Sequence, residues 1–220
     1  MTKHCNFVVM DDIFKTIEKP AEGYLTEKKS KFISYIFPVK DTDQVKELLD
    51  EYRKKYYDAR HVCWAYMLGE KRDEFRSNDD GEPSGTAGRP ILGQINSYEL
   101  TNVLIIVIRY FGGTLLGTGG LIKAYKEAAE EAILNAEILE KTIDKKITIH
   151  FEYTILNDVM RVLKQFEEVV WEQDFQESCT MHLQIRKSDF EHLYGSLTQI
   201  YGLEIVEEVT SDNGGETVKS

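Results

Sequence analysis

One junction in the chain, between a continuous apolar run and a glycine-rich segment, restricts the possible folds most strongly. Residues 103–108 read Val-Leu-Ile-Ile-Val-Ile, with no polar position, which is typical of a strand covered on both faces. Residues 109–120 then read Arg-Tyr-Phe-Gly-Gly-Thr-Leu-Leu-Gly-Thr-Gly-Gly. Apolar side chains follow at helical spacing: Leu121, Tyr125, Ala128, Ala132, Ile133 and Ala136. A central strand that enters a helix through glycines predicts a mixed α/β domain.

The residues before this junction predict two more strands and a helix. Runs of aromatic and β-branched residues predict strands at 33–39 and 62–67. Between them, Asp41 and Gln44 form a candidate capping box, and apolar residues follow at helical spacing. Residues 69–102 carry charges and turn-forming residues with little periodicity, so we expect a functional or disordered loop there.

A second pattern begins near residue 141. Strands are predicted at 143–153, 169–175, 180–186 and 204–209, with helices at 156–166 and 188–201. This βαββαβ order is that of ferredoxin-like domains. We therefore predict an N-terminal extension or first strand at 1–20, a first domain at 21–140, a ferredoxin-like domain at 141–209 and a mobile tail at 210–220. Residues 1–9 are a candidate upstream extension.

The charge of the chain limits its function. It has 220 residues, 42% of them hydrophobic, and a net charge of -11, of which -4 falls on residues 1–140 and -7 on 141–220. The apolar content indicates a folded protein, and the negative charge opposes bulk attraction to nucleic acid. A nucleic-acid role therefore requires a local basic patch. No apolar run reaches the roughly 18–20 residues of a membrane helix, and the three cysteines form no CxxC pair, so we expect a cytoplasmic protein with reduced thiols.

The glycine-rich segment is a candidate anion site, because backbone N–H groups and the helix dipole at such a turn favour negative charge. Thr118 stands where a Walker A loop needs lysine, and Ile122 stands where the dinucleotide fingerprint needs glycine. Purely structural glycines remain the alternative. Arg89, Arg109 and Lys123 could add positive charge to this turn.

The acidic loop and the histidines suggest no specific chemistry. Asp79, Asp80 and Glu82 could hold a cation, but they lack EF-hand spacing, and a polar turn held by Asx hydrogen bonds is the favoured interpretation. The histidines lack zinc-site spacing. We predict no catalytic residue, metal or cofactor, and an enzyme is the less favoured class. The sequence does not indicate an oligomeric state.

Two long segments resemble the signatures of the IMPACT family, also called the YigZ or UPF0029 family. They run from Asp80 to Pro90 and from Ile108 to Leu121. The resemblance is strong over about residues 20–135, and the C-terminal part is similar to the DUF1949 domain of bacterial members. The loop positions that carry the resemblance are Asp80, Gly81, Glu82, Pro83, Gly85, Thr86, Gly88, Tyr110, Gly112, Gly113, Gly117, Gly119 and Gly120.

The resemblance implies an α+β protein with a ribosomal protein S5 domain 2-like α/β domain followed by a ferredoxin-like domain. Both resemble late domains of elongation factor G. Bacterial members are suspected of binding nucleic acid or ribosomes, and the eukaryotic protein inhibits a stress kinase by competing for its activator. Eukaryotic members carry an RWD domain that is absent here, so the kinase role does not simply transfer.

Three hypotheses follow. The first is a non-enzymatic, translation-associated module that binds RNA, the ribosome or a translation-factor protein, with no membrane partner. Its candidate face contains Arg60, His61, Arg76, Arg89, Arg109 and Lys123. The second is a phosphate- or nucleotide-binding enzyme of the GHMP-kinase superfamily that uses the Gly112–Gly120 turn. The third is a protein-binding regulator that uses the second domain, where Tyr153, Trp171 and Phe175 could be exposed.

Overall fold

The computed structural model describes residues 12–166, 169–175 and 179–207. These residues form two compact units, one of residues 14–141 and the other of 142–207 together with Asp12 and Ile13. The predicted extension at 1–9 and the predicted tail at 210–220 lie outside the described residues. A mixed α/β architecture with antiparallel sheets is confirmed, and each unit has its own core.

The first unit is built on a five-stranded antiparallel sheet with the order β2-β3-β6-β4-β5. The predicted central strand is confirmed, because β6 occupies the middle position and its residues from Val103 to Arg109 are all buried. The strands are β2 (Ala21–Glu27), β3 (Ser30–Pro38), β4 (His61–Leu68), β5 (Glu74–Asn78) and β6 (Val103–Tyr110).

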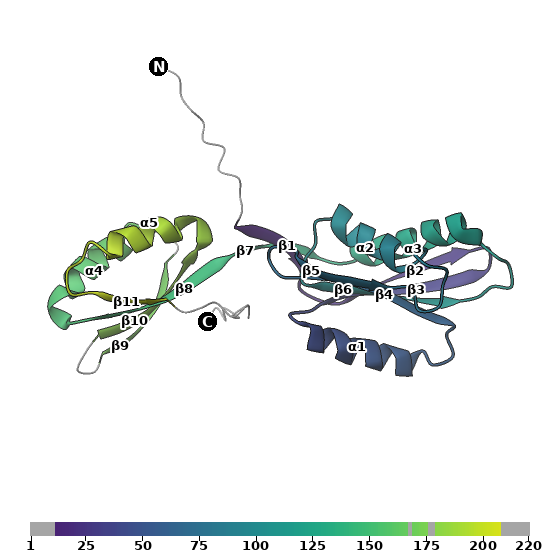
Figure 1. Ribbon diagram of the computed structural model, residues 1–220, viewed down its shortest axis with the longest axis horizontal. Coiled ribbons are helices and arrows are strands. Elements are labelled where there is room, and N and C mark those ends of the chain that lie inside the picture. Colours follow the sequence, from purple (N-terminus) through teal and green to yellow (C-terminus); the bar gives the residue numbers. More distant parts are fainter. Residues whose placement is uncertain (1–11, 167–168, 176–178, 208–220) are drawn as a thin grey trace, which may run out of the picture. The chain divides into compact units, whose positions relative to one another are not determined.

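Helices cover both faces of this sheet, as Figure 1 shows, with α1 (Thr42–Lys55) on one face and α2 (Gly88–Ser97) and α3 (Gly117–Leu134) on the other. Alternate residues of β6 divide between the faces. Leu104, Ile106 and Ile108 pack with α1, whereas Val103, Ile105 and Val107 pack with α2 and α3. In the described part of the chain, no helix is long and apolar enough to span a membrane.

The start of α1 is set by the predicted cap. Oδ1 of Asp41 accepts hydrogen bonds from the backbone N–H groups of Asp43 and Gln44, at 2.9 and 2.8 Å. The side chain of Gln44 reaches back and accepts the N–H of Lys40 at 2.9 Å, one residue before the cap. These bonds satisfy N–H groups that have no partner inside the helix, and the predicted helix is confirmed.

The prediction of an unstructured loop over 69–102 is wrong in part, since this stretch contains β5 and α2. β5 is an edge strand with four exposed or half-exposed polar residues, so it shows no alternation. α2 has only ten residues, and its buried Ile91 and Ile95 are its main periodic signal. Pro90 in its first turn is a helix-start signal that the sequence does contain.

A separate two-stranded sheet pairs β1 (Ile13–Ile17) with β7 (Ile138–Thr142). β1 therefore lies within the segment predicted as an extension or first strand. An isolated bridge also joins Lys15 to Leu100, and the N–H of Thr101 donates to the carbonyl of Lys15. These bonds attach the start of the described chain to the residues that precede β6.

The second unit has the predicted order of strand, helix, strand, strand, helix and strand. Its four-stranded antiparallel sheet has the order β11-β8-β10-β9, and α4 and α5 pack on it around a core that includes Ile149, Met181 and Leu193. The helices end three to four residues earlier than predicted. The elements are β8 (Asp144–Phe151), a 3-10 turn (Tyr153–Ile155), α4 (Leu156–Leu163), β9 (Val170–Phe175), β10 (Cys179–Arg186), α5 (Lys187–Leu197) and β11 (Glu204–Glu207).

Candidate functional site

The sheet register brings the acidic loop and the glycine-rich segment to the same end of the first unit. His61 at the start of β4 pairs with Arg109 near the end of β6. α3 begins a few residues after β6 ends, and the loop before α2 folds back over the first residues of β4. Both α2 and α3 therefore begin at this end of the sheet, where their dipoles present partial positive charge.

Glu82 is the centre of a buried polar cluster. Its Oε1 accepts hydrogen bonds from Nη1 of Arg109 at 2.5 Å and from the hydroxyl of Tyr125 at 2.9 Å. Nε2 of His61 lies 3.7 Å from the same oxygen. The Glu82 and Arg109 side chains are only 3% and 7% exposed. Arg109 therefore neutralises an internal carboxylate, and its charge is not presented at the surface as the binding-face hypothesis assumed.

Asp79 closes the loop onto the start of α2. Its carboxylate accepts the backbone N–H groups of Gly85, Ala87 and Gly88 at 2.8 to 3.0 Å. Burial alone would raise the pKa of Asp79, but these three bonds and the nearby charge of Arg89 outweigh burial, and the pKa is lowered. The first N–H groups of α2 are thus already occupied by an anion from the protein itself.

Asp80 and His61 fix the other side of the loop. Oδ2 of Asp80 accepts the N–H of Val62 at 2.6 Å, and Nδ1 of His61 donates to the carbonyl of Asp80 at 2.7 Å. Asp80 has a φ of +44° and Gly81 a φ of +83°, so the chain reverses sharply here. Glycine is the residue that adopts this conformation without strain.

Cys63 and Tyr125, neither of which is among the predicted site residues, complete the cluster. The thiol of Cys63 lies 3.0 Å from the carbonyl of Asp79 and 3.3 Å from the hydroxyl of Tyr125. Burial raises the pKa of both groups above their ordinary values, so both stay protonated. Tyr125 was predicted only as part of an apolar face. A lone tyrosine among buried alanines was the available signal, because a buried hydroxyl needs a hydrogen-bond partner.

The three loop carboxylates proposed as metal ligands each bind protein donors instead. Asp79 and Asp80 accept backbone N–H groups, and Glu82 accepts from Arg109 and Tyr125. Among the described residues, no three Asp, Glu, His or Cys side chains are grouped so that they could hold a metal ion. The arrangement is that of a polar loop whose conformation is fixed by its own hydrogen bonds to the protein.

Gly112 allows the glycine-rich segment to lie directly against the turn between β2 and β3. A Cβ atom at this position would overlap the backbone carbonyl group of Lys29. The N–H of Gly112 also donates to the hydroxyl of Ser30 at 3.2 Å. Any side chain at residue 112 would therefore separate the two backbones.

The N-terminus of α3 differs from that of α2 because no carboxylate of the described residues occupies it. Its N-cap is Leu116, no side chain caps it, and its first turn contains no acidic residue. Gly117, Thr118 and Gly119 are exposed, and a Cβ atom at Gly119 would contact nothing within 4 Å. The unpaired N–H groups of this turn are therefore available to an external anion.

The structure separates the six predicted basic residues. Arg60, Arg89 and Lys123 are exposed, and Lys123 lies 3.7 Å from Glu127. His61 is mostly buried and Arg109 is buried. Arg76 pairs with Tyr66, which packs on the α1 face, so Arg76 lies on the opposite face of the sheet from His61 and Arg109. The surface at this end thus retains three exposed cations of the six.

The aromatic residues suggested for a contact in the second unit also differ in position. Tyr153 is 73% exposed, whereas Trp171 is partly buried against the core of its unit. The side chain of Phe175 lies outside the described residues. Tyr153 alone thus remains as an exposed aromatic of this set within the described part of the chain.

Comparisons with known proteins point to one family. The model of the Impact N-terminal domain matches residues 28–133. The chain is 30% identical to "IMPACT family member YvyE" of Bacillus subtilis, over 79% of this chain and 80% of that protein. It is 35% identical to "IMPACT family member YigZ" of Escherichia coli, over 68% and 74%. A crystal structure of a hypothetical protein aligns over 90% of this chain and 98% of its own, with a TM-score of 0.65 and 27% identity.

Proposed function

The chain belongs to the IMPACT family, and from that premise we propose that it is a non-enzymatic, translation-associated regulator that binds RNA at the end of its five-stranded sheet. In this proposal the two units have the S5 domain 2-like and ferredoxin-like folds that the family resemblance implies. The protein works in the cytoplasm, and the RNA is ribosomal or ribosome-bound.

The open N-terminus of α3 is the observation that carries this proposal. Two helices begin at the same end of the sheet, but among the residues that the structure describes an internal carboxylate fills the first N–H groups of α2 alone. A phosphate group supplies the negative charge that the first turn of α3 lacks. Arg89, Arg60 and Lys123 are the exposed predicted cations that would add phosphate contacts around it.

Gly119→Ala tests this site without disturbing the fold. The added methyl group meets no atom within 4 Å and removes the flat surface that lets a phosphate approach the backbone. We expect weaker cosedimentation with ribosomes and weaker binding to a fluorescent 12-nucleotide RNA in 50 mM salt. Gly195→Ala, at an exposed helical glycine of the second unit with equally free surroundings, is the matched control.

The charges are tested separately. Arg89→Ala and Lys123→Ala should each weaken RNA binding and reduce the slope of log affinity against log salt by about 0.7. Lys146→Ala, at an exposed position of β8, should leave both quantities unchanged. If the wild-type protein binds neither ribosomes nor RNA at low salt, the proposed function is wrong.

The alternative function, a nucleotide-dependent enzyme, could use the same open turn for a phosphate. It has less support, because the carboxylates expected to hold its metal are bound to protein donors. Thermal shift with ATP or GTP and Mg²⁺ separates the two functions. A nucleotide-dependent rise in melting temperature that is lost in Gly119→Ala would favour the enzyme.

A further inference from the structure

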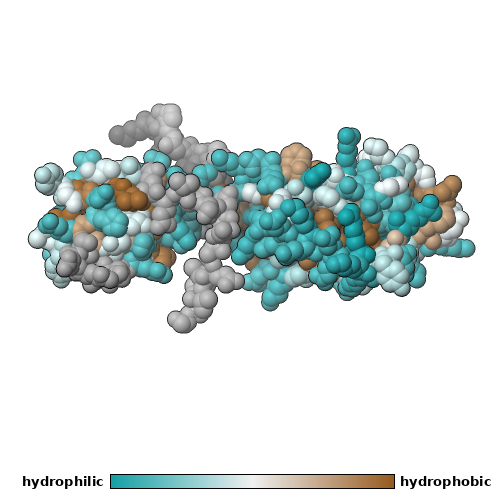
Figure 2. All heavy atoms as spheres, turned by 60° about the horizontal axis from the view of Figure 1, so that its bottom comes forward, coloured by the Kyte–Doolittle hydropathy of each residue, from teal (hydrophilic) through white to brown (hydrophobic). Residues whose placement is uncertain are grey.

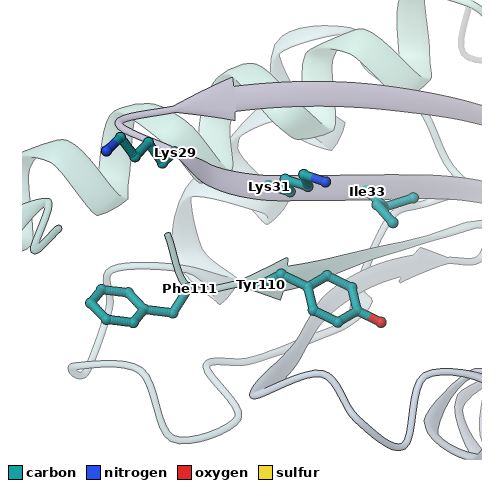
Figure 3. Close-up of a pocket in the computed structure, with 5 residues that line it drawn as sticks. All are labelled: Lys29, Lys31, Ile33, Tyr110 and Phe111. Atoms are coloured by element: carbon teal, nitrogen blue, oxygen red, sulfur yellow. The ribbon is translucent and has the colours of Figure 1, made fainter. Parts of the chain in front are cut away.

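A cleft on the other side of the glycine-rich segment combines lysines with aromatic rings. It has a volume of about 370 Å³ and is lined by Lys29, Lys31, Ile33, Tyr110 and Phe111. Figure 3 shows the residues of β3 and its preceding turn along one side and Tyr110 and Phe111 along the other. The volume falls in the range of small-molecule sites, about 300–1,000 Å³.

The register explains how the strands build this cleft. Lys31 pairs directly with Tyr110 across β3 and β6, so both side chains stand on the α1 face. α1 packs farther along the sheet and leaves this end uncovered, with Lys31 exposed and Ile33 and Tyr110 half-buried. The hydroxyl of Tyr110 donates to Asp58 at 2.8 Å, which holds the ring in place.

Phe111 offers an aromatic surface that is held in place from within the protein. The guanidinium carbon of Arg109 lies 5.7 Å from the centroid of its ring, while the side chain remains 42% exposed. Arg109 is itself fixed by Glu82. An exposed ring supported on a fixed cation is a platform on which a flat base can stack.

The turn that carries Lys29 is unusual for its residues. Glu27 pairs with Ser30, so Lys28 and Lys29 form a two-residue hairpin loop, and both have positive φ values, 44° and 67°. Such loops favour Asn and Gly, and lysine adopts this conformation at a cost in stability. Among the described residues, neither Lys29 nor Lys31 forms an ion pair, in a chain of net charge -11.

The surroundings favour a charged ligand over an apolar one. Figure 2 turns the α1 side of residues 14–141 toward the viewer and shows mostly hydrophilic side chains, with hydrophobic ones in small separate groups. Unpaired lysines beside an exposed ring match the backbone phosphates and bases of a single strand. A double helix would not present its bases to such a ring.

We propose that this cleft is a single-stranded RNA subsite, in which Phe111 stacks on a base and Lys29 and Lys31 bind the adjacent phosphates. The inference rests on the proposed function, because it takes the RNA as the partner and extends its path past Gly112. That residue packs directly on the Lys29 backbone, so the subsite adjoins the glycine-rich segment.

The test uses the full chain and a fluorescein-labelled 12-nucleotide uridine RNA, followed by anisotropy. Phe111→Leu should weaken binding about 5- to 100-fold, whereas Phe111→Tyr should retain it. Lys29→Asn removes the charge while suiting the positive φ, and Lys31→Thr suits a strand, so neither change should unfold the protein. Each should lower the salt slope by about 0.7.

A spectroscopic measurement detects stacking directly. The fluorescence of a Phe111→Trp variant should be quenched by the RNA to a greater extent than that of the wild-type protein, whose two tryptophans are buried (Trp64) and partly buried (Trp171). Lys146→Ala is the charge control. If the wild-type protein binds RNA but the Phe111, Lys29 and Lys31 variants bind equally well with unchanged slopes, the subsite is wrong and the proposed function stands. If the wild-type protein binds no RNA, both are wrong.

Discussion

At the scale of single residues, the Glu82–Arg109 pair joins the loop before α2 to the end of β6 through one buried contact. Both side chains are almost fully excluded from water, and Nε of Arg109 has no hydrogen-bond partner among the described residues. A buried charge is tolerated only when it is compensated. Removing either partner therefore affects stability far more than a surface ion pair such as Lys46–Asp43 would.

Glu82→Ala should lower the free energy of unfolding by about 3–5 kcal/mol, because it leaves the guanidinium of Arg109 buried without its partner. Urea denaturation at pH 7 measures this change. The double variant Glu82→Leu with Arg109→Met removes both charges and should recover part of the loss. A free energy of unfolding for Glu82→Ala within 1 kcal/mol of the wild-type value would contradict the importance of this pair for stability.

Asp79→Asn should lower stability at pH 7 by about 1–2 kcal/mol, since the amide replaces one acceptor oxygen with a donor. The folded protein holds the pKa of Asp79 below its ordinary value, so the stability from this charge is present above about pH 4 and is lost as pH falls through the folded pKa. The difference between wild type and variant should therefore narrow in acid. Urea denaturation from pH 7 to pH 3 measures it, and a constant difference would contradict this account.

At the scale of elements, the two glycines that frame the glycine-rich segment have opposite structural roles. Gly112 is in contact with another backbone, whereas Gly119 has free space around it in the first turn of α3. In the sequence, both belong to one glycine-rich segment, and nothing local distinguishes them. The difference between them comes from the tertiary structure, in which the β2–β3 turn, more than 80 residues earlier in the chain, packs against residue 112.

Gly112→Ala should therefore destabilise the protein, whereas Gly119→Ala should not. The first forces the Lys29 turn away and should lower the melting temperature by several degrees. The second adds helix propensity and should be neutral or stabilising, by up to about 1 kcal/mol. Thermal unfolding by circular dichroism compares the two. Equal losses of melting temperature in the two variants would contradict this difference in their surroundings.

Elements that carry a strong local signal in the sequence were predictable, and those defined by tertiary contacts were not. The apolar run of β6 and the cap at Asp41 each carry a local signal, and both are confirmed. β5 is a polar edge strand, so it lacks that signal. Arg109 was expected at the surface because arginine usually is, and its buried partner Glu82 lies 27 residues away in sequence.

At the scale of the whole molecule, the separate cores of the two units imply that each unit can unfold independently of the other. The core around β6 and the core around Met181 contain different residues, and each is complete within its own unit. The net charge is also unequal, with -7 of -11 on residues 141–220. This more acidic part of the chain is the less favourable one for an RNA backbone, which fits the proposal that RNA binds to the first unit.

Leu193→Ala should destabilise the second unit by about 2–5 kcal/mol and leave the first nearly unchanged, because Leu193 is fully buried in the core of its own unit. Hydrogen exchange followed by mass spectrometry measures the stability of each unit separately. Amides of β8 and β10 should exchange faster, while those of β6 keep their protection. Matching losses of protection in β6 would mean that the molecule unfolds as one cooperative unit.

The pairing of β1 with β7 puts the two ends of the 14–141 segment on neighbouring strands, as Figure 1 shows. Segments whose ends meet tolerate insertion into a host loop and reconnection in a new order. A short peptide could therefore join the two ends of residues 14–141 and give a circular chain. The same segment could also be inserted into a loop of another protein without long linkers.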